Sequence, residues 1–384
     1  MSEKAKKYTF RKFINDAHLW LGIGSGIILF LVCLSGTVLT FEEEIKALFA
    51  KEFAVADTAG STLPMKELTE SLSQEGIVSN VTIPAETNEA LKFSIKTSPQ
   101  ERRGTTYFVD PYSGEYQKVQ KSNLDGFFLT MFKMHRWLLL ETEVGRPIVG
   151  VATLIFLFMA ISGIILWFPK RMKWKNFKPG LKIKFNANWK RINHDLHNTL
   201  GFYASIFLVI MSLTGLFWSF EWYRDAGSKV LGTKVFGGRD GGPKFESALK
   251  PGSTEKTFEE ILQLTSKELD FKGETTINFP ATDKEVYNIT KSNNSRFSTV
   301  ITDKLVLDRD GALLHKELFA EKPLNVQIAS LIKPIHMGTI YGNFSKIIYF
   351  FACLIATSLP ITGTLIWINK LKTKKTKKKQ PSFV

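Results

Sequence analysis

The sequence predicts a membrane protein: an all-α bundle of four transmembrane helices with two α+β modules outside the bilayer. Two observations lead to this prediction. Four uncharged apolar stretches of about 21 to 23 residues each are long enough to cross the hydrocarbon core, which takes roughly 20 helical residues. Long polar segments, each sufficient for a small domain, separate the first stretch from the second and the third from the fourth. The apolar stretches are residues 19–41, 148–168, 199–220 and 347–368.

Basic residues are concentrated in three short segments of the chain. Residues 1–17, 170–191 and 370–384 together hold 21 lysines and arginines against two acidic residues, so the rest of the chain is slightly acidic although its total charge is +15. This is the positive-inside pattern, and we expect both termini and the middle loop in the cytoplasm. The Lys-rich tail directly follows a span, which favours this explanation over nucleic-acid binding. No nucleic-acid partner is expected.

These patterns divide the chain into nine consecutive segments. The two longest polar segments are expected to fold outside the cytoplasm, and four others form the membrane spans with their lead-in residues. The segments are a basic N-terminus (1–17), transmembrane helix 1 (18–41), a first outer module (42–127), a lead-in helix with transmembrane helix 2 (128–168), a basic loop (169–193), transmembrane helix 3 (194–220), a second outer module (221–325), a lead-in segment with transmembrane helix 4 (326–368) and a Lys-rich tail (369–384).

The two outer modules have similar sequence patterns. In each, an amphipathic helical pattern precedes a strand, and a second strand then ends in a turn. Because helix, module and helix follow one another twice, the patterns predict an internal duplication whose halves are related by a pseudo-two-fold axis along the membrane normal. The helical patterns are residues 65–73 and 258–269, the first strands 91–96 and 286–291, and the strand-and-turn segments 108–114 and 306–311.

Every span also contains a small hydroxyl residue followed by glycine. Small residues at such positions let neighbouring helices approach closely, and we expect that role here. Cys33 and Cys353 also lie within spans, where packing is a more reasonable role than a disulfide. The four pairs are Ser35-Gly36, Ser162-Gly163, Thr214-Gly215 and Thr362-Gly363.

Four of the six histidines occupy equivalent positions in the two halves. His18 and His197 stand at the expected cytoplasmic ends of spans 1 and 3, while His135 and His336 lead into spans 2 and 4 from outside. Axial imidazoles from two helices hold a b-type haem, and two such haems stacked across a bilayer carry single electrons. We therefore predict two haem b groups, one held by His18 with His197 and one by His135 with His336. The sequence contains no Cys-x-x-Cys-His, which excludes covalent c-type attachment.

Neighbouring residues refine the inner site. Gly22 and Gly201 come one helical turn after His18 and His197, where the missing side chain leaves room for a macrocycle, although close helix packing is an alternative role. His194 lies three residues before His197 on a similar helix face. It is therefore an alternative ligand, a propionate partner or a proton carrier.

Cationic side chains near the histidines could pair with haem propionates, as arginine and lysine commonly do with carboxylates. The alternative for each is an ordinary solvated or positive-inside role. No catalytic residue beyond the haems is expected, since no acid or nucleophile constellation is present. The cationic candidates are Arg11, Lys190 and Arg191 inside, and Arg136, Arg146 and Lys333 outside.

Several of these motifs resemble one family, the PepSY-associated transmembrane proteins, which include bacterial ferric-siderophore reductases of the inner membrane. The resemblance covers nearly the whole chain. It rests on the His-x-Trp-Leu-Gly motif at residues 18–22, Ser-Gly-Thr at 35–37, His-Arg-Trp at 135–137 and His-Asp-Leu-His-Asn at 194–198. The turn at residues 109–115 resembles the end of a PepSY module.

The resemblance implies a reductase that passes electrons outward through two b haems to a ferric siderophore in the periplasm, where one electron converts Fe³⁺ to Fe²⁺ for uptake. The lipid bilayer and the siderophore are then partners. The sequence has no Gly-x-Gly-x-x-Gly motif and only short basic inner segments, so the electron donor is expected to be a quinol or a separate cytoplasmic reductase. Two alternatives stay open: a haem b subunit serving another periplasmic acceptor, and a non-redox PepSY sensor or protease-regulating protein.

Overall fold

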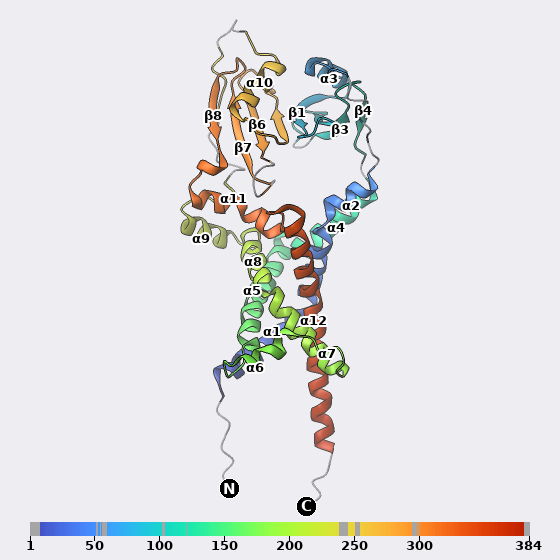
Figure 1. Cartoon of the computed structure of the whole chain (residues 1–384), viewed down its shortest axis with the longest axis vertical. Helices are drawn as coiled ribbons and strands as arrows, with labels where there is room; N and C mark the ends of the chain where they lie inside the picture. The colour runs from blue at the N-terminus through green and yellow to red at the C-terminus, as the bar shows by residue number, and fades with distance from the viewer. Residues whose placement is uncertain are drawn as a thin grey trace, which may run out of the picture.

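A computed structural model describes residues 8–379 apart from residues 51–52, 54, 56–59, 102–103, 121, 238–244, 250–253, 294–297 and 299, with side chains up to residue 373. The first basic residues of the chain and the tail side chains beyond residue 373 lie outside the described residues. A helical bundle stands below a sheet domain, and both termini lie at the end of the bundle away from the sheet (Figure 1). We call the two ends of the bundle the terminal end and the sheet end.

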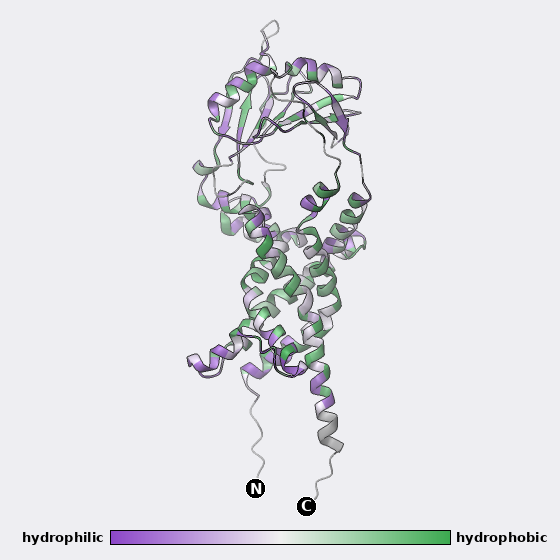
Figure 2. Cartoon of the chain, turned by 45° about the vertical axis from the view of Figure 1, so that its right-hand side comes forward, coloured by the Kyte–Doolittle hydropathy of each residue, from purple (hydrophilic) through white to green (hydrophobic). Residues whose placement is uncertain are grey.

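Within the described residues, four helices are long and apolar enough to cross a membrane, which agrees with the predicted number of spans. Apolar residues dominate the bundle, whereas polar residues are concentrated in the sheet domain and at the terminal end (Figure 2). The chain is therefore a membrane protein with a sheet domain attached to one end of its bundle. The spans are α1 (Phe10–Leu39), α5 (Thr142–Trp167), a third span from Trp189 to Ser219, and α12 (Gly342–Lys379).

The third span changes helix type near its start. It consists of α7 (Trp189–Asp195), a π-helical turn at Leu196–Leu200 and α8 (Gly201–Ser219). A single π turn inside an α-helix rotates the residues before it relative to those after it, and such turns are frequent at functional sites. The sequence patterns do not predict this turn.

Two spans extend further than the apolar stretches indicate. α1 begins at Phe10 rather than at residue 18, because the Thr9 side chain caps it by accepting a hydrogen bond from the Lys12 N–H at 3.3 Å. α12 continues to Lys379, since lysine is a good helix former and α12 has no glycine or proline after Gly363. The predicted N-terminal segment and Lys-rich tail are thus partly helical.

Short helices connect the spans to each other and to the sheet. α4 ends at Leu138 in a left-handed conformation, with φ of 55°, so the predicted lead-in helix is separate from α5. α11 ends in the same way at Gly338, with φ of 71°. At the sheet end these helices are α2 (Glu42–Phe49), α4 (Asn123–Trp137), α9 (Glu221–Leu231) and α11 (Leu324–Met337), and at the terminal end α6 (Trp174–Phe177) is followed by a 3₁₀ turn (Lys178–Leu181).

The two polar segments form one antiparallel sheet with the strand order β4-β3-β2-β1-β5-β6-β7-β8. The first four strands come from the first predicted module and the last four from the second, and β1 pairs with β5 where the modules meet. The strands are β1 (Ile77–Ile83), β2 (Leu91–Lys96), β3 (Thr105–Val109), β4 (Tyr116–Lys118), β5 (Thr275–Asn278), β6 (Tyr287–Ser292), β7 (Thr302–Leu307) and β8 (Leu313–Glu317), and one helix precedes each set, α3 (Met65–Leu72) and α10 (Phe258–Glu268).

A single hydrophobic core extends across the junction of the two modules. Val81 of β1 is paired with Ile277 of β5, and both are fully buried. The core also includes Phe93 and Leu68, and fully burying each such side chain stabilises the fold by about 1.5–3 kcal/mol. The Met65 N–H donates to Glu259 at 2.7 Å, joining the starts of α3 and α10. The modules predicted as separate units therefore share one sheet.

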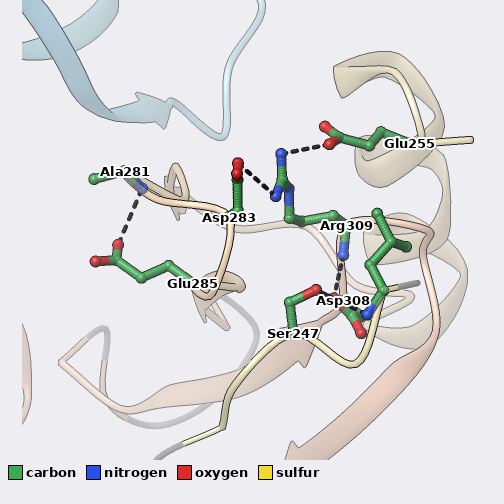
Figure 3. Close-up of polar contacts among 8 residues, drawn as sticks. Ser247, Glu255, Ala281, Asp283, Glu285, Asp308 and Arg309 are labelled. Carbon is green, nitrogen blue, oxygen red and sulfur yellow. Dashed lines mark hydrogen bonds and ion pairs between the residues drawn. The ribbon is translucent and has the colours of Figure 1, made fainter. Parts of the chain in front are cut away.

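The turn after β7 is held by a buried carboxylate. Asp308 accepts hydrogen bonds from the Ser247 hydroxyl at 2.5 Å and from the N–H groups of Ala248 and Arg309 at 2.9 and 2.7 Å (Figure 3). The Arg309 guanidinium pairs with Asp283 and Glu255. Burial raises the pKa of Asp308, but these hydrogen bonds outweigh burial, so its pKa lies below the ordinary value.

Candidate functional site

Each of the four predicted histidines packs against one of the hydroxyl-glycine pairs of a neighbouring span. The contact has the same three parts every time, namely the carbonyl of residue i, the hydroxyl of residue i+3, and the glycine at i+4. We call this arrangement a histidine cradle. His135 lies against Val32, Ser35 and Gly36 of α1, His18 against Met159, Ser162 and Gly163 of α5, His336 against Met211, Thr214 and Gly215 of α8, and His197 against Leu359, Thr362 and Gly363 of α12.

The glycines give the imidazole rings the space to reach the helix backbone. A Cβ atom added at Gly36 or Gly215 would lie 3.0 Å from Cε1 of His135 or His336. At Gly363 the distance to Cε1 of His197 would be 3.2 Å, and at Gly163 the distance to Cε1 of His18 would be 3.6 Å. The pairs that the sequence analysis assigned to helix packing therefore accommodate histidine rings.

At the terminal end the ring nitrogens Nδ1 bond to side-chain hydroxyls. His18 Nδ1 lies 2.7 Å from Ser162 Oγ, and His197 Nδ1 lies 2.9 Å from Thr362 Oγ1. The Ser162 hydroxyl donates its own proton to the Met159 carbonyl at 3.1 Å, and the Thr362 hydroxyl donates to the main chain of α12 in the same way. With its proton on that carbonyl, each hydroxyl oxygen accepts from the ring, and we assign the ring proton to Nδ1 on this basis.

At the sheet end the main chain takes this role. His135 Nδ1 lies 2.8 Å from the Val32 carbonyl, and His336 Nδ1 lies 3.1 Å from the Met211 carbonyl and 3.0 Å from Thr214 Oγ1. A carbonyl oxygen only accepts, so Nδ1 carries the proton in both rings. Burial lowers the pKa of His336 to about 4, so its ring is neutral near pH 7.

All four rings consequently present the unprotonated nitrogen Nε2 as a free lone pair. The hydrogen bonds of these rings to other described residues all use Nδ1. A neutral imidazole whose Nδ1–H is held by an acceptor is the usual form of a histidine that binds a metal through Nε2. The arrangement therefore suits four metal ligands.

The two histidines of the sheet-end pair lie close together. The rings of His135 and His336 have centroids 6.4 Å apart and an interplanar angle of 52°. Metal–imidazole bonds of about 2.0 Å place the centroids of two ligand rings roughly 6 Å apart. This pair is therefore spaced for one metal atom between its rings, and Trp218 covers His336 with a centroid distance of 5.2 Å.

His18 and His197 line one cavity of about 360 Å³ at the terminal end. Gly22 and Gly201 line the same cavity, and a Cβ added at Gly22 would meet only the flexible end of Met159, at 2.8 Å. Cavities of this size and largely apolar lining are typical of cofactor sites. The structure thus places both predicted glycines beside the histidine pair, with open space between the spans.

His194 also lines this cavity but lies at its rim. Its side chain is 55% exposed, and Nδ1 lies 3.5 Å from the buried carboxylate of Asp195. The π turn separates His194 from His197, so the two rings no longer share the environment that regular α-helical spacing predicts. Among the two alternatives for the inner ligand, only His197 lies in a cradle.

The predicted cationic partners differ in their contacts. Arg11 donates to the carbonyls of Leu166 and Phe168 at 2.6 and 2.9 Å, and Arg191 pairs with Asp195 at 2.8 Å. Arg146 Nε is buried without a hydrogen-bond partner. The remaining candidates are Arg136, which lies over the rings of Phe132 and Trp137, and Lys333 and Lys190, which are exposed.

The two pairs lie at opposite ends of the bundle. His18 and Gly36, which contacts His135, are both on α1, and the helix between them rises roughly 27 Å. His197 and Gly215 are separated by the same number of residues on the third span. This distance is close to the hydrocarbon thickness of about 30 Å, so each pair lies near one face of a bilayer.

The fold and the histidine pairs define a class of protein: a four-helix membrane bundle with one pair of histidines near each end. The family model described as the PepSY-associated TM region matches residues 16–370. The chain belongs to this family. No curated protein matches the chain in sequence.

Proposed function

We propose that the protein is a di-haem b oxidoreductase of the bacterial inner membrane that passes electrons to a ferric siderophore in the periplasm. The observation that carries this proposal is the set of four Nε2 lone pairs, arranged as two facing pairs at the two ends of one bundle. Paired neutral imidazoles are the ligands of b-type haem, and b haem supplies one-electron transfer.

The residues present fit such a group. His18 and His197 would hold one haem and His135 and His336 the other, while Gly22 and Gly201 leave space in the terminal-end cavity. Arg146 Nε and Trp137 Nε1 are buried without a hydrogen-bond partner among the described residues, and each is a donor that a propionate at the sheet end would satisfy. The remaining work of the chain is to orient these side chains and to keep water out of the bundle.

The proposed orientation puts the terminal end in the cytoplasm. Both termini and the basic segment 170–191 lie at this end, and their lysines and arginines supply the positive-inside signal (Figure 1). The sheet domain is then periplasmic, and its two four-strand halves with matching order and one preceding helix each support an origin by internal duplication.

The proposed chemistry at the sheet end is one-electron reduction of bound iron. Siderophores hold Fe³⁺ through hard oxygen donors, and one electron gives the softer Fe²⁺, which these donors bind less tightly and release. One quinol that is oxidised to quinone releases two protons and supplies electrons for two ferric chelates. A cytoplasmic reductase docking on the basic terminal end is the other donor consistent with the charge distribution.

Anaerobic reoxidation of the protein tests this proposal. Purified protein reduced with dithionite and freed of excess reductant is mixed with ferric siderophores, and Fe²⁺ is trapped with a ferrous chelator. We expect haem reoxidation together with one trapped Fe²⁺ per electron. The His336→Ala variant should lose this reaction while its terminal-end haem remains reducible.

Two outcomes of this experiment favour the alternatives. Haem that stays reduced with every ferric chelate offered indicates a haem b subunit for another periplasmic acceptor. A protein without haem indicates a non-redox PepSY protein.

A further inference from the structure

The two histidines at the terminal end depend on side chains for their orientation. His18 gives its Nδ1 proton to Ser162, which is only 1% exposed and passes its own proton to a carbonyl of α5. His197 gives its Nδ1 proton to Thr362, which donates in turn to the carbonyls of Ser358 and Leu359 at 3.0 and 3.2 Å. In each case a ring, a hydroxyl and a carbonyl form a chain of two hydrogen bonds, and such chains polarise their members.

At the sheet end both rings reach a backbone carbonyl, and the Thr214 hydroxyl also lies within hydrogen-bond distance of His336, at 3.0 Å. His135 bonds to the Val32 carbonyl at 2.8 Å. The neighbouring Ser35 hydroxyl donates to the carbonyls of Leu31 and Val32 rather than to the ring. The same step of the cradle is thus occupied by a hydroxyl in both places, but Ser35 leaves the ring proton of His135 to the Val32 carbonyl, whereas Ser162 is the hydrogen-bond partner of the His18 ring.

We propose that Ser162 and Thr362 are positioning residues of the terminal-end site, which fix the Nδ1–H form of His18 and His197 and strengthen these imidazoles as ligands. An acceptor on Nδ1 increases the basicity of Nε2, and a more basic ligand stabilises the ferric state of the bound haem. Removing the acceptor therefore raises the reduction potential of that haem. The redox part of this inference rests on the proposed function, whereas the proton position on the rings does not.

A redox titration of the holoprotein tests the electronic consequence. The variants Ser162→Ala and Thr362→Val are purified in lipid nanodiscs and titrated with the visible spectrum as readout. We expect the reduction potential of one of the two haem components to rise. The ferric form of that haem should become about tenfold less stable relative to the ferrous form, which corresponds to ~59 mV for a one-electron couple. The low-spin electron paramagnetic resonance signal of the same component should move, and Ser162→Thr and Thr362→Ser should restore the wild-type values.

Ser35→Ala is the matched control. It removes a hydroxyl at the same step of a cradle from a residue equally buried, at 1% exposure, but it removes no acceptor of a ring proton. We expect both haem components of this variant to keep their potentials. The proposal is overturned if Ser162→Ala shifts neither component, shifts both, or shifts no more than Ser35→Ala does.

Nuclear magnetic resonance of the haem-free chain tests the proton position independently. In protein labelled with ¹⁵N at histidine and produced without haem, the nitrogen shifts of His18 should report a proton on Nδ1. Ser162→Ala should turn this state into a mixture with Nε2–H, while His135 is unaffected. If His18 carries its proton on Nε2 in the wild type, the positioning role is wrong whether or not the protein binds haem. A chain that binds no haem but shows the expected shifts contradicts only the proposed function.

Discussion

The two halves of the chain hold their histidines in the same kind of cradle but differ in the groups that bond to Nδ1 and in the surroundings. Residues 35–36 and 162–163 of the first half and 214–215 and 362–363 of the second all form cradles for a ring from another helix. The first span is a regular α-helix, whereas the third has a π turn at Leu196–Leu200. Asn15 of the first half is matched by His194 in the second. The features shared by the two halves are those that orient the histidine rings.

Each pair takes one histidine from each half, so the two halves should contribute equally. We expect His18→Ala and His197→Ala each to remove about half the haem, because one imidazole alone cannot hold a six-coordinate low-spin haem. His135→Ala and His336→Ala should each remove the other half. The haem-to-protein ratio and the redox component that remains measure the loss of haem in each variant. Unequal losses for the two histidines of one pair would contradict an equal contribution from the two halves.

The glycines of the cradles should matter in the order of their distances to the rings. An alanine at position 36 or 215 would place its Cβ 3.0 Å from Cε1 of the histidine in that cradle, so the ring must shift. An alanine at position 163 would place its Cβ 3.6 Å from Cε1 of His18, which is an ordinary van der Waals contact. We expect roughly tenfold weaker haem binding for Gly36→Ala and Gly215→Ala, as for other changes to the second shell of a metal site. Gly163→Ala should change little.

Gly24→Ala serves as the control for these variants, because a Cβ at Gly24 has no neighbour within 4 Å. Haem binding measured by titration into haem-free protein gives the ranking. Equal effects at all four positions would mean that the glycines act through helix stability rather than through ring contact.

The sheet halves can be compared through their turn carboxylates. Asp110 accepts from the Tyr112 N–H and the Ser113 hydroxyl inside its own turn, whereas Asp308 reaches Ser247 and Ala248 in a distant segment. We expect Asp308→Ala to destabilise the sheet domain by about 1–3 kcal/mol, because buried donors lose their partner. Hydrogen exchange of residues 245–249 in the full chain measures the loss, with exposed Asp225→Ala as the control.

The pH dependence of this region has a defined sign. The folded pKa of Asp308 lies below its ordinary value of 3.8, so its carboxylate contributes stability above that pH. The contribution is lost as the pH falls through the lowered folded pKa. Asp308→Ala should therefore show less loss of protection than the wild type between neutral and acidic pH, and an equal loss in both would contradict the assignment.

The smallest effect is expected for His194, the residue without a cradle. Its exposed ring contacts only Asp195 among the partners that the structure gives it. We expect His194→Ala to keep both haems and to shift the terminal-end component little. Loss of the terminal-end haem in this variant, with retention in His197→Ala, would reverse the ligand assignment.

Much of the bundle and its histidine pairs can be predicted from the sequence, because spans are long apolar runs and the repeated sequence pattern relates His18 to His197 and His135 to His336. The pairing of His135 with His336 follows from symmetry, and the structure brings their rings together at 6.4 Å. The cradles could not be predicted, since a Ser-Gly or Thr-Gly pair in a span reads the same whether it faces a helix or an imidazole. Their signal was the recurrence of such a pair in all four spans.

Two other features were also beyond the sequence patterns. The π turn at Leu196–Leu200 joins α7, which packs against α12, to α8, and no sequence pattern marks it. The junction of β1 with β5 is a contact between segments almost 200 residues apart, and strand patterns do not specify which edges pair. The π turn lies between His194 and Gly201 and separates the surroundings of His194 from those of His197. The β1–β5 junction joins the two modules into one sheet.

The visible spectrum of purified protein from haem-replete cells tests the central claim most directly. A pyridine haemochrome assay, combined with protein quantification, should give two b-type haems per chain with a low-spin spectrum, and the His18→Ala and His336→Ala variants should each retain one. A colourless wild-type protein, or a haem content unaffected by both variants, would contradict the assignment of the four histidines as haem ligands.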